Sequence, residues 1–89
     1  MSITGQYSIY VLRSLQDYQN YVGLSANVDK RLKMHNAGKV RSTKSRRPFH
    51  LIYQEFVGSL QKARTREKYF KSAAGRRYLQ DIFKVENVG

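Results

Sequence analysis

Two neighbouring runs of β-forming residues stand near the start of the chain, Tyr7-Ser-Ile-Tyr-Val-Leu-Arg13 and Asn20-Tyr-Val-Gly-Leu24. The first run alternates with the two-residue period of a β-strand, and the second is short and rich in the same residue types. The segment between them carries Asp17, which suits a tight turn. The two runs therefore predict an antiparallel β-hairpin.

The hairpin is expected to bring two tyrosines and a glycine together. If the connecting loop has an even number of residues, pleat parity places Tyr10, Tyr21 and Gly23 on one face. A glycine in a strand often stands where a backbone or a ligand comes close. On these residues alone two interpretations are open: ordinary half-buried strand tyrosines, or two phenols that converge on a ligand.

Helix signals follow the hairpin. Ser25 or Asn27 can cap a helix that runs to about Ala37, with Gly38 as its stop. The order β-β-α-β-α-α predicts an α+β fold with a small three-stranded antiparallel sheet flanked by helices. We expect a single domain over residues 1–89, with its core at about 7–83. The later elements are expected to be a basic loop at 38–48, a strand at 49–57, a helix at about 59–72 and a shorter helix at 76–83 that restarts at Gly75.

The charge points to a polyanionic partner. The 89 residues include 17 Lys and Arg against 6 Asp and Glu, a formal net charge of +11. Such a density of one sign on a folded domain favours nucleic acid. An anionic membrane is the weaker alternative, because the basic segments lack the broad aliphatic face of an interfacial helix. The bases expected to contact phosphates lie in the loop after the first helix: Lys39, Arg41, Lys44, Arg46 and Arg47.

Several functional classes are excluded by composition. The chain has no cysteine, so it forms neither disulfides nor a thiolate metal site. It has no apolar run that resembles a signal peptide or could span a bilayer. We therefore expect a cytoplasmic protein without membrane association, and charge alone names its partner only as nucleic acid.

One carboxylate occupies an unexpected place. In the helix that starts near residue 60, Glu67 shares a stripe with Ala63 and Phe70, where an apolar residue is expected and where the flanking cations do not reach directly. Buried carboxylates are costly unless they are paired or bind a metal. An ion pair with Arg31 or another base is one interpretation, and a hard-cation ligand facing a phosphate groove is the other. His35, taken alone, is typical of a partly buried core histidine.

Taken together, Ser8-Ile9-Tyr10, Tyr21-Val22-Gly23, Arg31, His35 and Glu67 resemble the GIY-YIG nuclease superfamily. The likeness covers roughly residues 7–80 and is closest to small stand-alone bacterial members described as excision-repair nuclease-like. Flanking segments such as Ser42-Thr-Lys-Ser-Arg-Arg-Pro48 recur in that subgroup. The resemblance implies a metal-dependent endonuclease that hydrolyses DNA phosphodiester bonds, directed by DNA structure rather than sequence, in DNA repair or recombination.

The resemblance also implies a role for each site residue. Tyr10 would position or deprotonate the attacking water, Tyr21 would hydrogen-bond around the scissile phosphate, and Gly23 would let the backbone approach. Arg31 would offset charge on phosphorus, and His35 would orient water or take a proton. Glu67 would be the single protein ligand of Mg²⁺ or Mn²⁺. We expect the five side chains to line one concave, solvent-open surface.

The chain departs from the family pattern in three places. Ser8 stands where the motif has glycine, and Val22 where it has isoleucine. Many members carry an asparagine late in the domain, whereas this chain has Leu79, Gln80 and Ile82 there and only Asn87 in its tail. The alternative function is therefore a non-catalytic DNA- or RNA-binding module that retains the fold.

Overall fold

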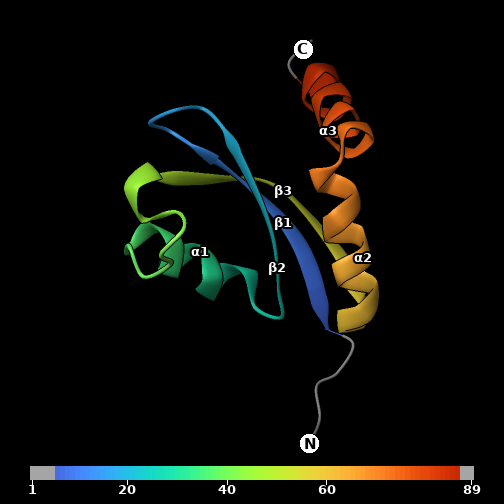
Figure 1. Ribbon diagram of the computed structural model, residues 1–89, viewed down its shortest axis with the longest axis horizontal. Coiled ribbons are helices and arrows are strands. Elements are labelled where there is room, and N and C mark those ends of the chain that lie inside the picture. The colour runs from blue at the N-terminus through green and yellow to red at the C-terminus, as the bar shows by residue number, and fades with distance from the viewer. Residues whose placement is uncertain (1–5, 87–89) are drawn as a thin grey trace, which may run out of the picture.

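The structure is a computed structural model that describes the backbone of residues 6–86 and the side chains of residues 6–83. In chain order its elements are β1 (Tyr7–Ser14), β2 (Asn20–Ser25), α1 (Val28–Asn36), a 3₁₀ turn (Lys44–Arg46), β3 (Phe49–Gly58), α2 (Leu60–Lys71) and α3 (Ala73–Glu86). The three strands form an antiparallel sheet in the order β2-β1-β3. In Figure 1, α1 lies on one side of this sheet, and α2 and α3 lie on the other. The predicted α+β fold, with a three-stranded antiparallel sheet flanked by helices, is confirmed.

The hairpin register follows from its loop. Arg13 pairs with Asn20, so six residues connect paired positions, and Tyr10 pairs with Gly23. The Asp17 carboxylate accepts a hydrogen bond from the Gln19 N–H at 2.8 Å, as a turn-forming aspartate does. The loop has the even count on which the predicted shared face of the two motif tyrosines depends, and the structure shows that α1 covers this face.

The main core lies on the opposite face, between the sheet and the two C-terminal helices. Strand residues Ile9, Val11 and Val22 pack there against Ala63 and Phe70. Full burial of a valine, isoleucine or phenylalanine side chain contributes on the order of 1.5–3 kcal/mol. The face toward α1 carries Tyr10, Tyr21 and the buried Leu12.

The junction of α2 and α3 differs from the prediction. We expected a helix to restart after Gly75, but Gly75 lies inside the first turn of α3, where its N–H donates to the Ser72 hydroxyl. A Cβ at Gly75 would lie 2.1 Å from the Tyr69 carbonyl oxygen. The glycine therefore allows α3 to pack directly onto the end of α2, and it interrupts no helix.

Helix α1 is capped at its start, and the loop after it is partly buried. Asn27 caps α1 by accepting from the Lys30 N–H, and Gly38, with φ of 78°, ends the helical region as predicted. The loop that follows is more firmly held than its basic composition predicted, because Val40 and Thr43 are buried. Across residues 6–86, no helix has the length and apolar character to cross a membrane.

Candidate active site

Three aromatic side chains meet beneath α1. Tyr10 comes from β1, Tyr21 from β2 and His35 from α1, and the His35 ring centroid lies 5.7 Å from that of Tyr10 and 5.0 Å from that of Tyr21. The two tyrosine rings are 6.3 Å apart. The hairpin register places the two phenols side by side. Val28, Leu32 and His35 recur at helical spacing on one face of α1, and this face is turned toward the sheet. The structure thus brings together three of the five predicted catalytic side chains.

A chain of hydrogen bonds runs through the imidazole. The Tyr10 hydroxyl lies 2.9 Å from His35 Nε2, and His35 Nδ1 lies 2.7 Å from the Thr43 hydroxyl. Thr43 in turn donates to the Val40 carbonyl at 3.3 Å. A hydroxyl that donates its only proton to a carbonyl can only accept from Nδ1. This network assigns the proton to Nδ1 and makes Nε2 the acceptor of the Tyr10 hydroxyl.

The pair is uncharged at neutral pH. Burial lowers the pKa of His35 to about 4, and the nearby charge of Arg31 acts in the same direction. Burial also raises the pKa of Tyr10, and the Arg31 guanidinium opposes that rise. Both shifts favour a neutral phenol beside a neutral imidazole.

The expectation of one solvent-open surface is wrong for two residues. Tyr10 is 1% exposed and His35 is fully buried, whereas Tyr21, Arg31 and Glu67 are partly exposed. The physical reason is close packing on the α1 side of the sheet, which covers both side chains. The Phe49 ring, for example, packs against His35 with 5.9 Å between the ring centroids. The site therefore has two parts: Tyr21, Arg31 and Glu67 at the surface, and the Tyr10–His35 pair buried beneath them.

Gly23 is needed for the position of Tyr10. A Cβ at Gly23 would lie 2.5 Å from the Tyr10 hydroxyl oxygen, closer than real contacts allow. The phenol therefore occupies the space that a side chain would fill. The group that makes the close approach expected at Gly23 is thus the Tyr10 side chain.

Glu67 faces the site from α2. Its side chain is 25% exposed and pairs with Lys71 Nζ at 3.3 Å, one helical turn later. An ion pair with a base is one of the two interpretations that the sequence leaves open for Glu67, and Lys71 is the base that forms it, because its flexible stem bends round to that face. The charge of Glu67 raises the pKa of Tyr10, after the larger effect of burial, while Arg31 lowers it. Both charged groups therefore lie within electrostatic reach of the same phenol.

The donor set around Glu67 is small. Within the described part of the chain, no group of three or more His, Cys, Asp or Glu side chains gathers that could hold a metal ion by protein ligands alone. A single partly exposed carboxylate suits a hard cation that keeps most of its water and takes phosphate oxygens. The chemistry of Glu67 is compatible with that kind of site.

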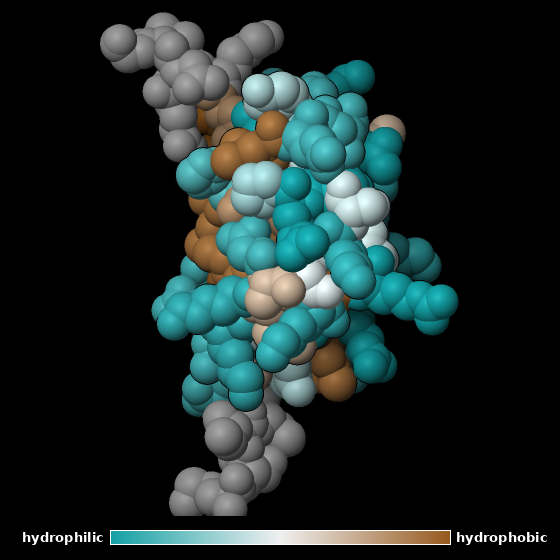
Figure 2. Space-filling view, turned by 90° about the vertical axis from the view of Figure 1, so that its left-hand side faces the viewer, coloured by the Kyte–Doolittle hydropathy of each residue, from teal (hydrophilic) through white to brown (hydrophobic). Residues whose placement is uncertain are grey.

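The basic loop divides into two groups. Arg46 pairs with Asp17 at 2.9 Å, and this hydrogen bond holds the pKa of Asp17 below its usual value. The Arg47 Nε–H donates to the Lys44 carbonyl, which holds the guanidinium against the loop. The side chains of Lys39, Arg41 and Lys44 are exposed, and no acidic residue among 6–83 pairs with them. Figure 2 shows that hydrophilic residues cover much of this face of the molecule.

One residue of the site was missed from the sequence, and one expected residue lies outside the structure. Thr43 is fully buried and hydrogen-bonded to His35, although the basic composition of its loop indicates exposure to solvent. Its only sequence signal was its place in the segment 42–48, which recurs in the resembling subgroup. In the region of the family's late asparagine, Leu79 packs in the core, and Asn87 lies outside the described residues.

The chain is similar in sequence to known proteins over most of its length. The model of the GIY-YIG catalytic domain matches residues 6–79. The UPF0213 protein of Staphylococcus haemolyticus is 37% identical over 75 residues, which cover 83% of this chain and 90% of the relative. The UPF0213 protein of Syntrophus aciditrophicus is 40% identical over 76 residues, covering 83% and 86%. The UPF0213 protein YazA of Bacillus subtilis is 38% identical over 69 residues, covering 76% and 69%.

No solved structure gives a significant match. The family model nevertheless spans both motif strands, the helix with Arg31 and His35, and the helix with Glu67. The chain belongs to the GIY-YIG nuclease domain family.

Proposed function

We propose that this protein is a metal-dependent endonuclease that hydrolyses DNA phosphodiester bonds. The observation that carries the proposal is the Tyr10–His35 hydrogen bond of 2.9 Å, with the charges of Arg31 and Glu67 acting on the same phenol. Perturbed titratable groups gathered at one place are typical of catalytic sites. Family membership supports the same activity.

The reaction requires three tasks of the protein. Hydrolysis joins a water oxygen to phosphorus and breaks the P–O3′ bond, leaving a 5′-phosphate and a 3′-hydroxyl. Tyr10 takes the water proton as it passes its own to His35 Nε2, and the departing 3′ oxygen is protonated by solvent. Arg31 stabilises the charge on phosphorus with a fixed fork of donors, and Tyr21 hydrogen-bonds to the phosphate. Because Tyr10 is buried, its partly exposed neighbours must shift when DNA binds.

Thr43 is the positioning residue of this arrangement. By accepting from Nδ1 it holds the tautomer in which Nε2 faces Tyr10 with a free lone pair. Such an outer hydrogen bond sets which ring nitrogen can act. His35 and Thr43 therefore act through Tyr10 rather than on the substrate.

The metal would be held by Glu67. Mg²⁺ or Mn²⁺ would polarise a phosphate oxygen and lower the pKa of a bound water. The partly exposed carboxylate suits this cation, and Lys71 is the positive charge that now neutralises it. The ammonium and the cation would compete for the same oxygens.

A nicking assay tests the activity. Supercoiled plasmid incubated with the wild-type protein should be relaxed in the presence of Mg²⁺ or Mn²⁺ and stay intact in EDTA. Plasmid that stays intact with every divalent cation would overturn the enzyme assignment. That outcome would favour the second candidate, a DNA- or RNA-binding module that keeps the fold, which the burial of Tyr10 and the absent late asparagine support.

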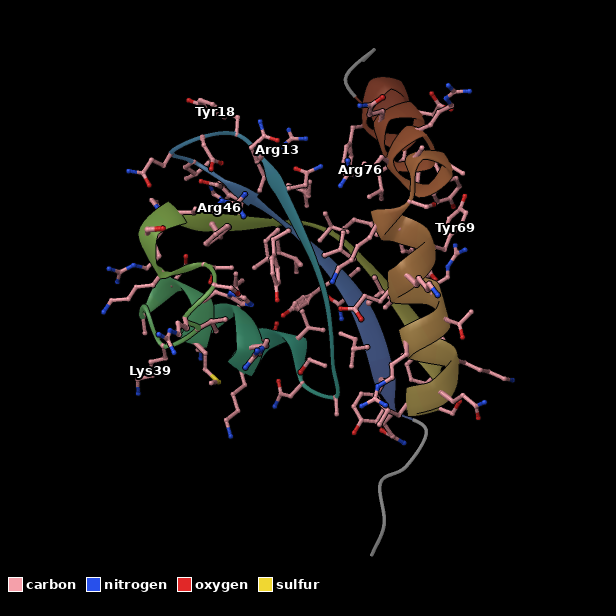
Figure 3. All side chains as sticks on the ribbon, in the orientation of Figure 1. Arg13, Tyr18, Lys39, Arg46, Tyr69 and Arg76 are labelled. Atoms are coloured by element: carbon pink, nitrogen blue, oxygen red, sulfur yellow. The ribbon has the colours of Figure 1, made fainter. Side chains whose placement is uncertain are left out.

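The basic loop is proposed to bind DNA without reading its sequence. Lys39, Arg41 and Lys44 are free to contact phosphates, and phosphate contacts fix position without specifying bases. Figure 3 places Lys39 at the outer edge of the loop. This mode of binding supports our proposal of a substrate chosen by DNA structure rather than by sequence, with a role in repair or recombination.

Salt dependence measures these contacts. Changing Lys39 and Arg41 together to glutamine should flatten the slope of log K against log salt by about two units, because each lost contact releases about one counterion fewer. Affinity for duplex DNA across a salt series gives the slope. Lys62→Gln with Arg64→Gln, on the exposed side of α2, makes the same charge change and should leave the slope nearly unaltered. An unchanged slope for the loop variant would show that DNA docks elsewhere.

A further inference from the structure

A second groove lies on the opposite face of the sheet from α1. It has a volume of about 660 Å³ and runs between the β1–β2 hairpin and the helices α2 and α3. Cations reach it from three elements: Arg13 from the hairpin, Lys71 from the end of α2 and Arg76 from α3. In Figure 3, Arg13 and Arg76 lie toward one another across this region. None of the lining residues in the described part of the chain is an aspartate or glutamate.

Aromatic rings stand among these cations. Tyr18, Tyr21 and Phe83 line the groove, and the Arg13 guanidinium lies 5.4 Å from the Phe83 ring centroid. The Arg13 Nε–H donates to Asn20 at 3.2 Å, so the cation is oriented without being neutralised. Positive charge interleaved with aromatic rings is the pattern that binds single-stranded nucleic acid, where phosphates meet the cations and bases stack on the rings.

The tip of the hairpin presents an unusual side chain. Tyr18 is 72% exposed, and it has a φ of 59°, in the left-handed region that few tyrosines adopt. The sharp turn directs a large aromatic ring into solvent at the mouth of the groove. An exposed ring of this kind offers a free face for stacking.

The groove is continuous with the candidate active site through Tyr21. Tyr21 lines the groove and also lies 5.0 Å, between ring centroids, from His35. Lys71 lines the groove as well and pairs with Glu67. A nucleic acid strand whose phosphate sits at the site therefore has a basic, aromatic path leading away from it.

We propose that this groove binds a single-stranded segment of DNA adjoining the phosphodiester that is cut. This inference rests on the proposed function and extends it to the substrate class, namely branched DNA with an unpaired strand beside the scissile bond. Duplex DNA does not fit the observation as well, because its base faces are covered by stacking and cannot use the exposed rings. The basic loop on the α1 side would hold the duplex arm, and the groove would hold the unpaired one.

Binding without cleavage tests the groove directly. Fluorescence anisotropy of a labelled oligothymidine in EDTA should show about tenfold weaker binding by Arg76→Glu and by Tyr18→Ala, the scale of losing one stacked base or its phosphate contact. Arg77→Glu makes the same charge change at the next, exposed position, which does not line the groove. Phe56→Ala removes an aromatic ring of similar exposure, 69%, from β3. Both controls should bind within about twofold of wild type.

The outcomes separate this inference from the proposed function. If the controls weaken binding as much as the groove variants, or no variant does, the groove assignment is overturned whether or not the protein cleaves DNA. If the groove variants lose oligothymidine binding while the wild type never nicks DNA in Mg²⁺, the groove stands and the enzyme assignment falls. Arg76→Gln removes the positive charge without adding a negative one and should also weaken binding. The thermal midpoint of each variant shows whether a loss of binding results from a loss of folding.

Discussion

Changing Glu67 to glutamine should lower the rate of DNA cleavage at least ~10²-fold, the scale of removing one preorganised electrostatic element from an active site. The amide keeps the shape of the side chain and loses the charge that would fix the cation. DNA affinity should hold steady or rise slightly, because a negative charge leaves a surface that faces phosphates. The rate of plasmid nicking, the affinity and the thermal midpoint, measured on one preparation, report these three quantities.

The stability of this variant should hardly change. The Glu67–Lys71 pair joins side chains that are 25% and 54% exposed at i and i+4, and such pairs contribute about 0.3–0.5 kcal/mol. Glu55→Gln is the matched control, since Glu55 pairs with Arg66 and hydrogen-bonds to Tyr53 away from the site. That control should lower the thermal midpoint and leave the activity per folded molecule intact. Glu67→Gln activity that only follows the folded fraction would refute the metal-ligand assignment.

Tyr10→Phe should reduce cleavage by on the order of 10²-fold or more, the usual contribution of a positioned acid–base group. The ring still fills the space beside Gly23, so the change removes only the hydroxyl that hydrogen-bonds to His35. Leaving the buried Nε2 without a partner should also cost about 1–3 kcal/mol of stability. Rates must therefore be expressed per folded molecule. Tyr53→Phe loses a hydroxyl bonded to Glu55 on the other face and should retain activity.

The pH dependence of the rate gives a second test of the same pair. Because burial lowers the pKa of His35 to about 4, the imidazole stays neutral and able to accept a proton far below pH 6.5. Protonation of His35 should thus not reduce cleavage between pH 7 and about pH 5. A wild-type rate that falls with a midpoint near 6.5, and loses that midpoint in His35→Gln, would contradict the buried neutral pair.

Local signals in the sequence were sufficient to predict the elements of the fold. The cap at Asn27 and the stop at Gly38 each depend on a few neighbouring residues, and each is present in the structure. The shared face of Tyr10 and Tyr21 required only the parity of a six-residue loop. Caps, stops and strand faces are predictable because they depend on regular periodicity and on hydrogen bonds between residues close in sequence.

The parts that could not be predicted depend on contacts between distant segments. The burial of Tyr10 results from packing among β1, β2 and α1, and no single segment records it. The Thr43–His35 bond forms because Val40 and Thr43 turn inward from a loop whose composition resembles a solvated one. The sequence predicts that a new helix starts after Gly75, and that prediction is wrong. The close contact between Gly75 and Tyr69, which explains the glycine, forms only when α3 packs onto α2.

The space beneath the Tyr10 ring also bears on how the hairpin finds its pairing. Sliding β2 along β1 by two residues would keep the same face inward but bring Tyr21 or Ser25, each with a Cβ, to the position where Gly23 now lies. Either slipped pairing would drive a side chain into the phenol, so only one alignment of the two strands accommodates both motif residues. The tyrosine and glycine therefore discriminate against misfolded registers, and the chemistry of the site and the specificity of folding depend on the same contact.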